Sequence, residues 1–259
     1  MVRAASRKIM DAARLCRAFA RAVDRQRSTG ARHTPNVATF DHAWFSSGGG
    51  ASLIGLVDGS IDRRSPDLVG ADIVTRDFVG CEDVCADTAI HGTNMATLLV
   101  GQGHQYLQGV VPRSRLLAAR VVGPTDMATP ARIAAGIDWL VVEGVRLVAL
   151  PLGSEIDSTI VASAIVRGHK AGVRFFAASG NGSGTVLFPA RHPCVMAVGP
   201  ADDRGRLLPQ ARRDPHLDLL APGWQIPGLL TTNGRGSGSG SSIACVMATG
   251  MAALQLEER

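Results

Sequence analysis

From Ser52 to the end of the chain, short apolar runs alternate with segments of helical periodicity. The predicted strands are residues 53–57, 116–122, 147–150, 173–178 and 195–198. The predicted helices are residues 91–100, 130–143, 159–171 and 242–257, and each follows a loop rich in Gly, Ser, Thr or Asp, as helix starts prefer. Strands that alternate with helices in this way predict an α/β fold with a mainly parallel central sheet covered by helices.

Length and composition are those of a globular protein. The chain has 259 residues, of which 46% are hydrophobic and 19% charged, so it is too apolar for an intrinsically disordered chain. One large domain is the simplest interpretation of this length. No apolar run approaches the roughly 18 residues that a membrane span needs, so we predict no membrane partner.

The positive charge is concentrated at the start of the chain. Residues 1–35 hold nine Lys or Arg against Asp11 and Asp24, a net charge of +7. The whole chain carries +5, so the remainder is close to neutral at −2. Basicity is therefore a property of the leading segment, and we predict no nucleic-acid partner for the domain that follows it.

The leading segment has the pattern of an amphipathic helix, with apolar residues at helical spacing: Ile9, Ala13, Cys16, Ala20 and Val23. Three interpretations stay open: a helix docked on the domain, a docking arm for an acidic peptide, and a transit-like sequence. Residues 27–50, which contain "FSSGGG", predict a linker. We therefore divide the chain into a basic arm with its linker over 1–50 and a domain over 51–259.

The cysteines favour a reducing, cytoplasmic compartment. There are five of them, Cys16, Cys81, Cys85, Cys194 and Cys245, so they cannot all pair internally, and their spacing is irregular. The basic segment also lacks the continuous apolar centre of a secretory signal.

Two ligand-binding alternatives are weaker. Cys81, Cys85, Asp87 and His91 have a spacing that a zinc site could use, but three residues separate the cysteines and no second pair exists. The Gly-Ser run before Ser242 lacks the Lys-Ser/Thr ending of a phosphate loop.

Three polar residues stand where the alternating elements begin or end. Asp58 follows the first strand in "IGLVDGSID", His91 opens a helix in "HGTNMATLLVG", and Ser242 begins a helix in "GSGSGSSIACVMATG". Taken singly, each has an ordinary interpretation as a turn former, a cap or part of a linker. In combination they have the chain order Asp, His, Ser, which is one of the orders in which a serine-hydrolase triad occurs.

Around these residues the sequence resembles the subtilisin-like serine proteases over about residues 52–254. "GSSIACVMATGMAAL" resembles the family's Gly-Thr-Ser-Met-Ala-Ala-Pro segment, "HGTNMA" its His-Gly-Thr-His-Val-Ala, and "VDGSIDRRSPDL" its Asp-Thr-Gly strand. "GVVPRSRLLAARVV", "GIDWL", "FPARHPCVMAVG" and "FFAASGNGSG" are also similar to family segments in the same order. The resemblance implies a three-layer α/β/α fold and a serine endopeptidase. Because some compact intracellular members of this family mature ribosomally made peptides, limited cleavage of a precursor peptide is one hypothesis for this chain.

The resemblance also assigns roles to residues of this chain. Ser242 would be the nucleophile, His91 the general base and Asp58 its partner, while the Asn181 amide and the Ser242 N–H would hold the oxyanion. This chemistry requires no metal or organic cofactor, and the sequence leaves a structural calcium undetermined. The implied substrate-binding residues are Pro151, Leu152, Gly153, Ala178, Ser179, Gly180 and Leu187.

Departures from the family pattern leave a second function open. Pro151 replaces the family's usual serine, Val246 replaces its helix proline, and Leu187 stands where a small residue commonly forms the floor of the pocket. Leu187 predicts a preference for a small or apolar residue before the cut.

Since only about fifty residues precede the first strand, a long inhibitory propeptide is not expected. The alternatives are an active endopeptidase, acting on an acidic precursor peptide held by the basic arm or in general degradation, and a weak or inactive domain that binds peptides as a scaffold.

Overall fold

The structure is a computed structural model that describes residues 10–19, 52–80, 86–123 and 128–256. A single seven-stranded sheet forms its centre, with the order β3-β5-β2-β6-β7-β8-β9 and parallel pairing between all neighbours. In chain order the strands are β2 (Leu53–Asp58), β3 (Ile73–Asp77), β5 (Arg115–Arg120), β6 (Leu147–Leu150), β7 (Arg174–Ala178), β8 (Val195–Ala201) and β9 (Leu219–Pro222). The predicted α/β class with a mainly parallel sheet is confirmed.

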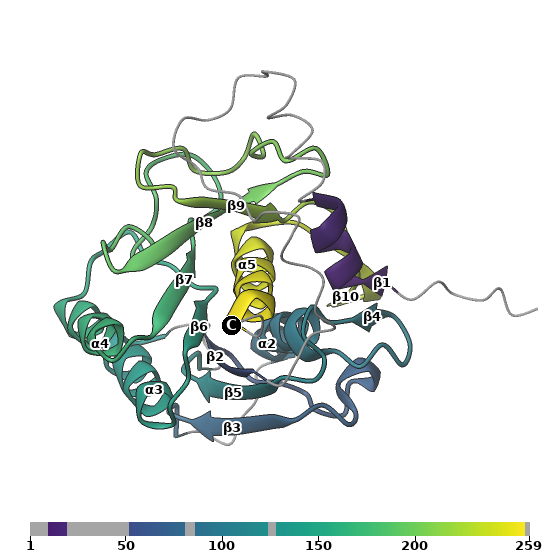
Figure 1. The fold of residues 1–259 in the computed structure, drawn as a ribbon, viewed down its shortest axis with the longest axis horizontal. Helices are drawn as coiled ribbons and strands as arrows, with labels where there is room; N and C mark the ends of the chain where they lie inside the picture. The colour runs from purple at the N-terminus through teal and green to yellow at the C-terminus, as the bar shows by residue number, and fades with distance from the viewer. Residues whose placement is uncertain (1–9, 20–51, 81–85, 124–127, 257–259) are drawn as a thin grey trace, which may run out of the picture.

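Helices cover both faces of this sheet. They are α2 (Ala86–Val100), α3 (Pro130–Val142), α4 (Thr159–Lys170) and α5 (Ser241–Leu256), and a 3₁₀ turn, η2, spans Pro66–Leu68. Figure 1 shows α2 and α5 on the concave face and α3 and α4 on the opposite face, which gives three layers. Side chains at the start of α3 and α4 cap these helices, since Thr129 accepts from Arg132 N–H and Ser158 from Val161 N–H. In the described part of the chain, no helix is long and apolar enough to cross a membrane.

All five predicted strands and all four predicted helices are present, with shifted ends and some additions. α2 begins at Ala86, so His91 lies in its second turn and does not open the helix as predicted. β3 and β9, which form the two edges of the sheet, were not predicted. The antiparallel hairpin of β10 (Ile226–Thr231) and β11 (Gly234–Gly238), whose glycines suggested a linker, was not predicted either.

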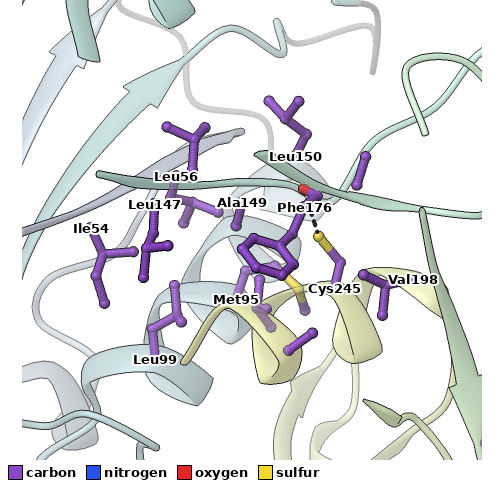
Figure 2. Packing of buried hydrophobic residues seen from close by; sticks show 14 of the residues in the cluster. Ile54, Leu56, Met95, Leu99, Leu147, Ala149, Leu150, Phe176, Val198 and Cys245 are labelled. Carbon is purple, nitrogen blue, oxygen red and sulfur yellow. Dashed lines mark hydrogen bonds between the residues drawn. The ribbon is translucent and has the colours of Figure 1, made fainter. Parts of the chain in front are cut away.

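The core lies on both faces of the sheet, against the α2–α5 layer and against α3 and α4. Figure 2 shows Leu56, Leu147 and Phe176 of the strands packed above Met95 of α2 and Cys245 of α5. Burying side chains of this size stabilises the fold by about 1.5–3 kcal/mol each. The Cys245 thiol donates to the main-chain oxygen of Phe176 at 3.2 Å, and burial raises its pKa, so it is a packing residue and not a reactive thiol.

The described part of the basic arm packs on the domain. β1 (Met10–Asp11) pairs in parallel with β4 (Leu107–Gln108), and residues 12–19 form a helix. Ala12, Cys16 and Phe19 are buried in the main core, whereas Ala13 is only half-buried. The buried face of this helix therefore differs from the predicted one. Of the predicted apolar residues, Ile9, Ala20 and Val23 lie outside the described residues.

Candidate active site

Asp58 is the last residue of β2, at the carboxyl edge of the parallel sheet where α/β proteins place their ligands. Its side chain is nearly buried, with 4% of the residue exposed. Oδ1 accepts from the N–H of Gly59 at 2.6 Å. The carboxylate is thus fixed by the strand and by the turn that follows it, and it can hold a second partner in a defined orientation.

His91 is that partner, because α2 packs directly against the turn after β2. Nδ1 of His91 donates to Oδ1 of Asp58 at 2.8 Å. The close approach depends on Gly92, where a Cβ atom would lie 2.4 Å from the main-chain oxygen of Ser60. A larger residue at this position would push the helix, and His91 with it, away from Asp58.

The charge of Asp58 raises the pKa of His91 above its ordinary value, while burial of the imidazole opposes the shift. The hydrogen bond from Nδ1 also fixes the tautomer, since the carboxylate can only accept. In the neutral ring Nε2 is then the lone-pair nitrogen, available as a base.

Ser242 lies in the first turn of α5, and the structure separates its environment from that of Ser241. Ser241 is buried, with 2% exposed, and its hydroxyl accepts from Gly180 N–H at 3.2 Å. The half-buried Ser242 faces a cavity and donates its hydroxyl to the main-chain oxygen of Pro151 at 3.0 Å. Among the described residues no hydrogen bond joins Ser242 and His91, so the hydroxyl must rotate to reach the imidazole.

Asn181 is held beside the start of α5. Its Oδ1 accepts from the N–H of Ser241 at 3.0 Å, which leaves Nδ2 as the amide donor of this side chain. The backbone of Gly240 has φ +151°, and a Cβ there would lie 3.2 Å from Nδ2. The glycine before the two serines therefore allows the amide to lie against the helix start.

One cavity of about 230 Å³ brings three of the predicted residues together. His91, Asn181 and Ser242 line it, together with Asn94 and Met95 of α2 and with residues 229–231 and 237–240 of the β10–β11 hairpin and the turn after it. A base, a hydroxyl and an amide donor around one space are the groups that acyl transfer to a serine needs.

The predicted substrate-binding residues flank this site but are unequally accessible. Ala178, Ser179 and Gly180 are buried at the end of β7, so they can contribute only backbone groups, and the Ser179 carbonyl already accepts from Leu187 N–H at 3.0 Å. Pro151 is buried as well. Leu152 is half-buried, and Gly153 is exposed.

Leu187 fills the space between the two flanking segments. A Cβ atom on Gly153 would lie 2.8 Å from Leu187 Cδ1, and one on Gly180 would lie 2.7 Å from the same atom. The antiparallel bridge between Ser154 and Phe188 fixes this arrangement, with hydrogen bonds of 2.7 and 3.0 Å. A pocket between these segments would be shallow.

Asn94 also lines this cavity and was not among the predicted residues. Its Nδ2 donates to the main-chain oxygen of Leu230 at 2.9 Å, and its Oδ1 accepts from Leu230 N–H at 2.7 Å. The side chain thus ties the β10–β11 hairpin to the helix that carries His91. Its position three residues after His91, on the same side of a helix, is the signal that could have identified it.

The zinc alternative gains no support. Cys81 and Cys85 lie outside the described residues, and Nδ1 of His91 is bound to Asp58. Within the described ranges no group of three or more His, Cys, Asp and Glu side chains is placed to hold a metal ion.

Comparison with known sequences shows the family of this chain. The model of the subtilase family, Peptidase_S8, matches residues 49–259. A thermophilic serine proteinase of Bacillus sp. (strain AK1) is 31% identical over 229 residues, which cover 87% of this chain and 57% of the relative. Alkaline elastase YaB of Bacillus sp. (strain YaB) is 32% identical over 179 residues, 68% of this chain and 47% of the relative. The chain thus spans about half the length of these relatives.

Two solved structures of similar size share the fold. The self-cleaved protease domain of PatA has a TM-score of 0.72 at 27% identity, with 81% of this chain and 82% of that chain covered. The prenylagaramide maturation protease PagA has a TM-score of 0.70 at 26% identity, with 80% and 76% covered.

Proposed function

Because the chain belongs to the subtilase family, we propose that it is a serine endopeptidase with Ser242 as nucleophile, His91 as general base and Asp58 as its partner. The observation that carries this proposal is the 2.8 Å bond between His91 Nδ1 and Asp58 Oδ1, beside a cavity that His91 shares with Ser242 and Asn181. The peptidase unit is assigned to residues 51–259, and residues 10–19, the described part of the basic arm, pack against it.

The proposed reaction follows from these positions. The Ser242 hydroxyl turns from Pro151 toward His91, gives its proton to Nε2 and attacks the peptide carbonyl. The Asn181 amide and the Ser242 N–H donate to the oxyanion that forms. His91 then passes the proton to the leaving amine as the C–N bond breaks, which leaves an ester on Ser242. Water, deprotonated by His91, hydrolyses the ester and regenerates the hydroxyl.

A serine-reactive fluorophosphonate tests the proposal directly. We expect it to label the wild-type protein on Ser242, located by peptide mapping, and the labelled protein to lose its activity on a mixed peptide pool read by mass spectrometry. The control is the Ser241→Ala variant, which keeps the proposed nucleophile. Absence of labelling on Ser242 would instead favour the scaffold function, for which the bond of the Ser242 hydroxyl to Pro151 is the supporting observation.

A peptide precursor is the proposed natural substrate. PagA is a maturation protease by name, and a chain with the same fold and a shallow pocket suits cleavage at selected sites. We further propose that the precursor is acidic, is held by the basic arm and is processed in the cytoplasm. Because Ala12, Cys16 and Phe19 are buried, deleting the arm would damage the fold.

Charge reversal at an exposed residue of the arm, Arg14→Glu, tests this idea without removing buried side chains. We expect KM for an acidic precursor to rise a few-fold at low salt, since one exposed charge contributes at most about 1 kcal/mol. KM for a short neutral peptide should stay unchanged. An equal effect on both peptides would rule out the proposed role of the arm in substrate binding.

The sequence predicts a small or apolar residue before the cut, and we propose that Leu187, between Gly153 and Gly180, favours a small one. In the Leu187→Ala variant we expect the ratio of kcat/KM for a Phe peptide over an Ala peptide to rise by about 10- to 100-fold, because the space between Gly153 and Gly180 opens. The ratio is measured within one enzyme preparation, so a loss of stability does not affect it. Leu207→Ala, a half-buried leucine elsewhere, is the matched control; a ratio that stays constant in Leu187→Ala contradicts the assignment.

A further inference from the structure

A second pocket, larger than the catalytic cavity, lies beside the start of α2. Its volume is about 450 Å³, within the range of roughly 300–1,000 Å³ found for ligand sites. Ile61, Ala89, Ile90 and Leu230 supply most of its apolar lining, and Asp62 and Arg64 stand at its rim. We name it the Ile61 pocket. None of the residues proposed for catalysis lines it.

The Ile61 pocket borders the catalytic cavity. Leu230 lines both, and Ile90, which lines the pocket, directly precedes His91, which lines the cavity. The walls are fixed to α2 on both sides: Asp62 N–H donates to Thr93 Oγ1 at 2.8 Å, and Asn94 holds Leu230. The pocket is therefore built into the same framework that positions His91.

The proposed reaction indicates which end of a bound peptide reaches this pocket. His91 must donate a proton to the leaving amine, so the amine side of the scissile bond lies on the His91 side of Ser242. The lining of the catalytic cavity agrees, since it contains His91 and the β10–β11 hairpin but, among the described residues, none from segments 151–153 and 178–180. A peptide that continued past the hairpin residue Leu230 would reach the Ile61 pocket, which Leu230 also lines.

We propose that the Ile61 pocket binds a large apolar side chain of the substrate, located on the amine side of the cleaved bond beyond the residue in the catalytic cavity. The inference rests on the proposed function. With this pocket, the enzyme would select substrates by the sequence that follows the cleaved bond as well as by the residue before it. The rim charges of Asp62 and Arg64 are paired at 3.0 Å, so the apolar lining and not charge provides the selectivity.

A binding experiment tests the pocket independently of turnover. The protein carries Ser242→Ala, and the probes are fluorescent peptides with Phe or Ser at each of the first four positions after a fixed cut site. We expect Phe at one position beyond the first to tighten Kd by about 10-fold or more, as burial of a large apolar side chain predicts. Ala89→Phe fills the pocket and should abolish this preference. Ala135→Phe, an exposed position of α3 on the opposite face of the sheet, is the matched control and should keep it.

The same peptides then serve as substrates of the protein with an intact Ser242. We expect kcat/KM to show the same preference, and in Ala89→Phe the ratio of kcat/KM for the Phe peptide over the Ser peptide should fall to about one. Equal binding of Phe and Ser peptides at all positions, or a preference that survives Ala89→Phe, would overturn the proposal. A preference in binding without cleavage would support the pocket and refute the proposed peptidase, so the two failures are distinguishable.

Discussion

Replacement of Ser242 by alanine is expected to lower kcat for peptide hydrolysis by about 10⁶-fold, the size of loss seen when a triad serine is removed from a subtilisin. The reason is that the oxyanion donors and the substrate contacts remain but no nucleophile is left to form the ester. Initial rates with a fluorogenic peptide, at enzyme concentrations high enough to detect the residual reaction, measure the loss. A low KM in the variant would show that the peptide still binds.

Ser241→Ala is the matched control, because the two serines are adjacent and have different surroundings. The Ser241 hydroxyl is buried and accepts from Gly180 N–H. Its removal should cost about 1–3 kcal/mol of stability, the penalty for an unsatisfied buried donor, and should leave kcat within about tenfold of the wild type. Activity that survives Ser242→Ala but disappears in Ser241→Ala would reverse the assignment of the nucleophile.

Sequence periodicity was sufficient for the centre of the sheet and insufficient for its edges. β2 and β6 are apolar runs buried on both faces, which is the pattern that identifies central parallel strands. β3 was missed because four of its five residues are exposed, and β9 because it ends in Pro222. β11 reads Gly-Arg-Gly-Ser-Gly, and only its pairing with β10 makes it a strand.

The sequence indicated which residues belong to the candidate site, but not which contacts they make. Asp58 and His91 were assigned from their chain order with Ser242 and from the resemblance to the subtilisin-like proteases, and not from their individual positions. The hydrogen bond between Ser242 and Pro151 depends on the rotamer of the serine side chain. The position of Leu187 between Gly153 and Gly180 depends on how three separate segments of the chain pack together. Neither leaves a local pattern in the sequence.

The basic arm shows how tertiary packing selects among the faces of a helix. Ala12, Cys16 and Phe19 are spaced four and three residues apart, as helical packing requires, but the segment holds so many alanines that several apolar stripes were available. Burial of Phe19, the largest apolar side chain in that part of the helix, determined which stripe faces the core.

Substitution of Asp58 by asparagine is expected to lower kcat by about 10⁴-fold with little change in the fold. An asparagine side chain keeps the shape but can donate to Nδ1 of His91, which then carries the lone pair and leaves the proton on Nε2. The lone pair of His91 would then face residue 58 and not Ser242. Asp138→Asn, an exposed carboxylate of α3 paired with Arg167, is the matched control and should retain full activity.

The pH dependence of the same variant separates orientation from charge. In the wild type the charge of Asp58 raises the pKa of His91, and only the neutral imidazole can act as base. The acid limb of kcat/KM should therefore lie above pH 6.5, the ordinary value for histidine. Without the charge the protonated ring loses its stabilisation, so in Asp58→Asn the limb should shift to lower pH. The rate of fluorophosphonate labelling as a function of pH measures the acid limb in the wild type and in the Asp58→Asn variant. An acid limb that does not move would mean that His91 is not the base, even if the overall rate falls as expected.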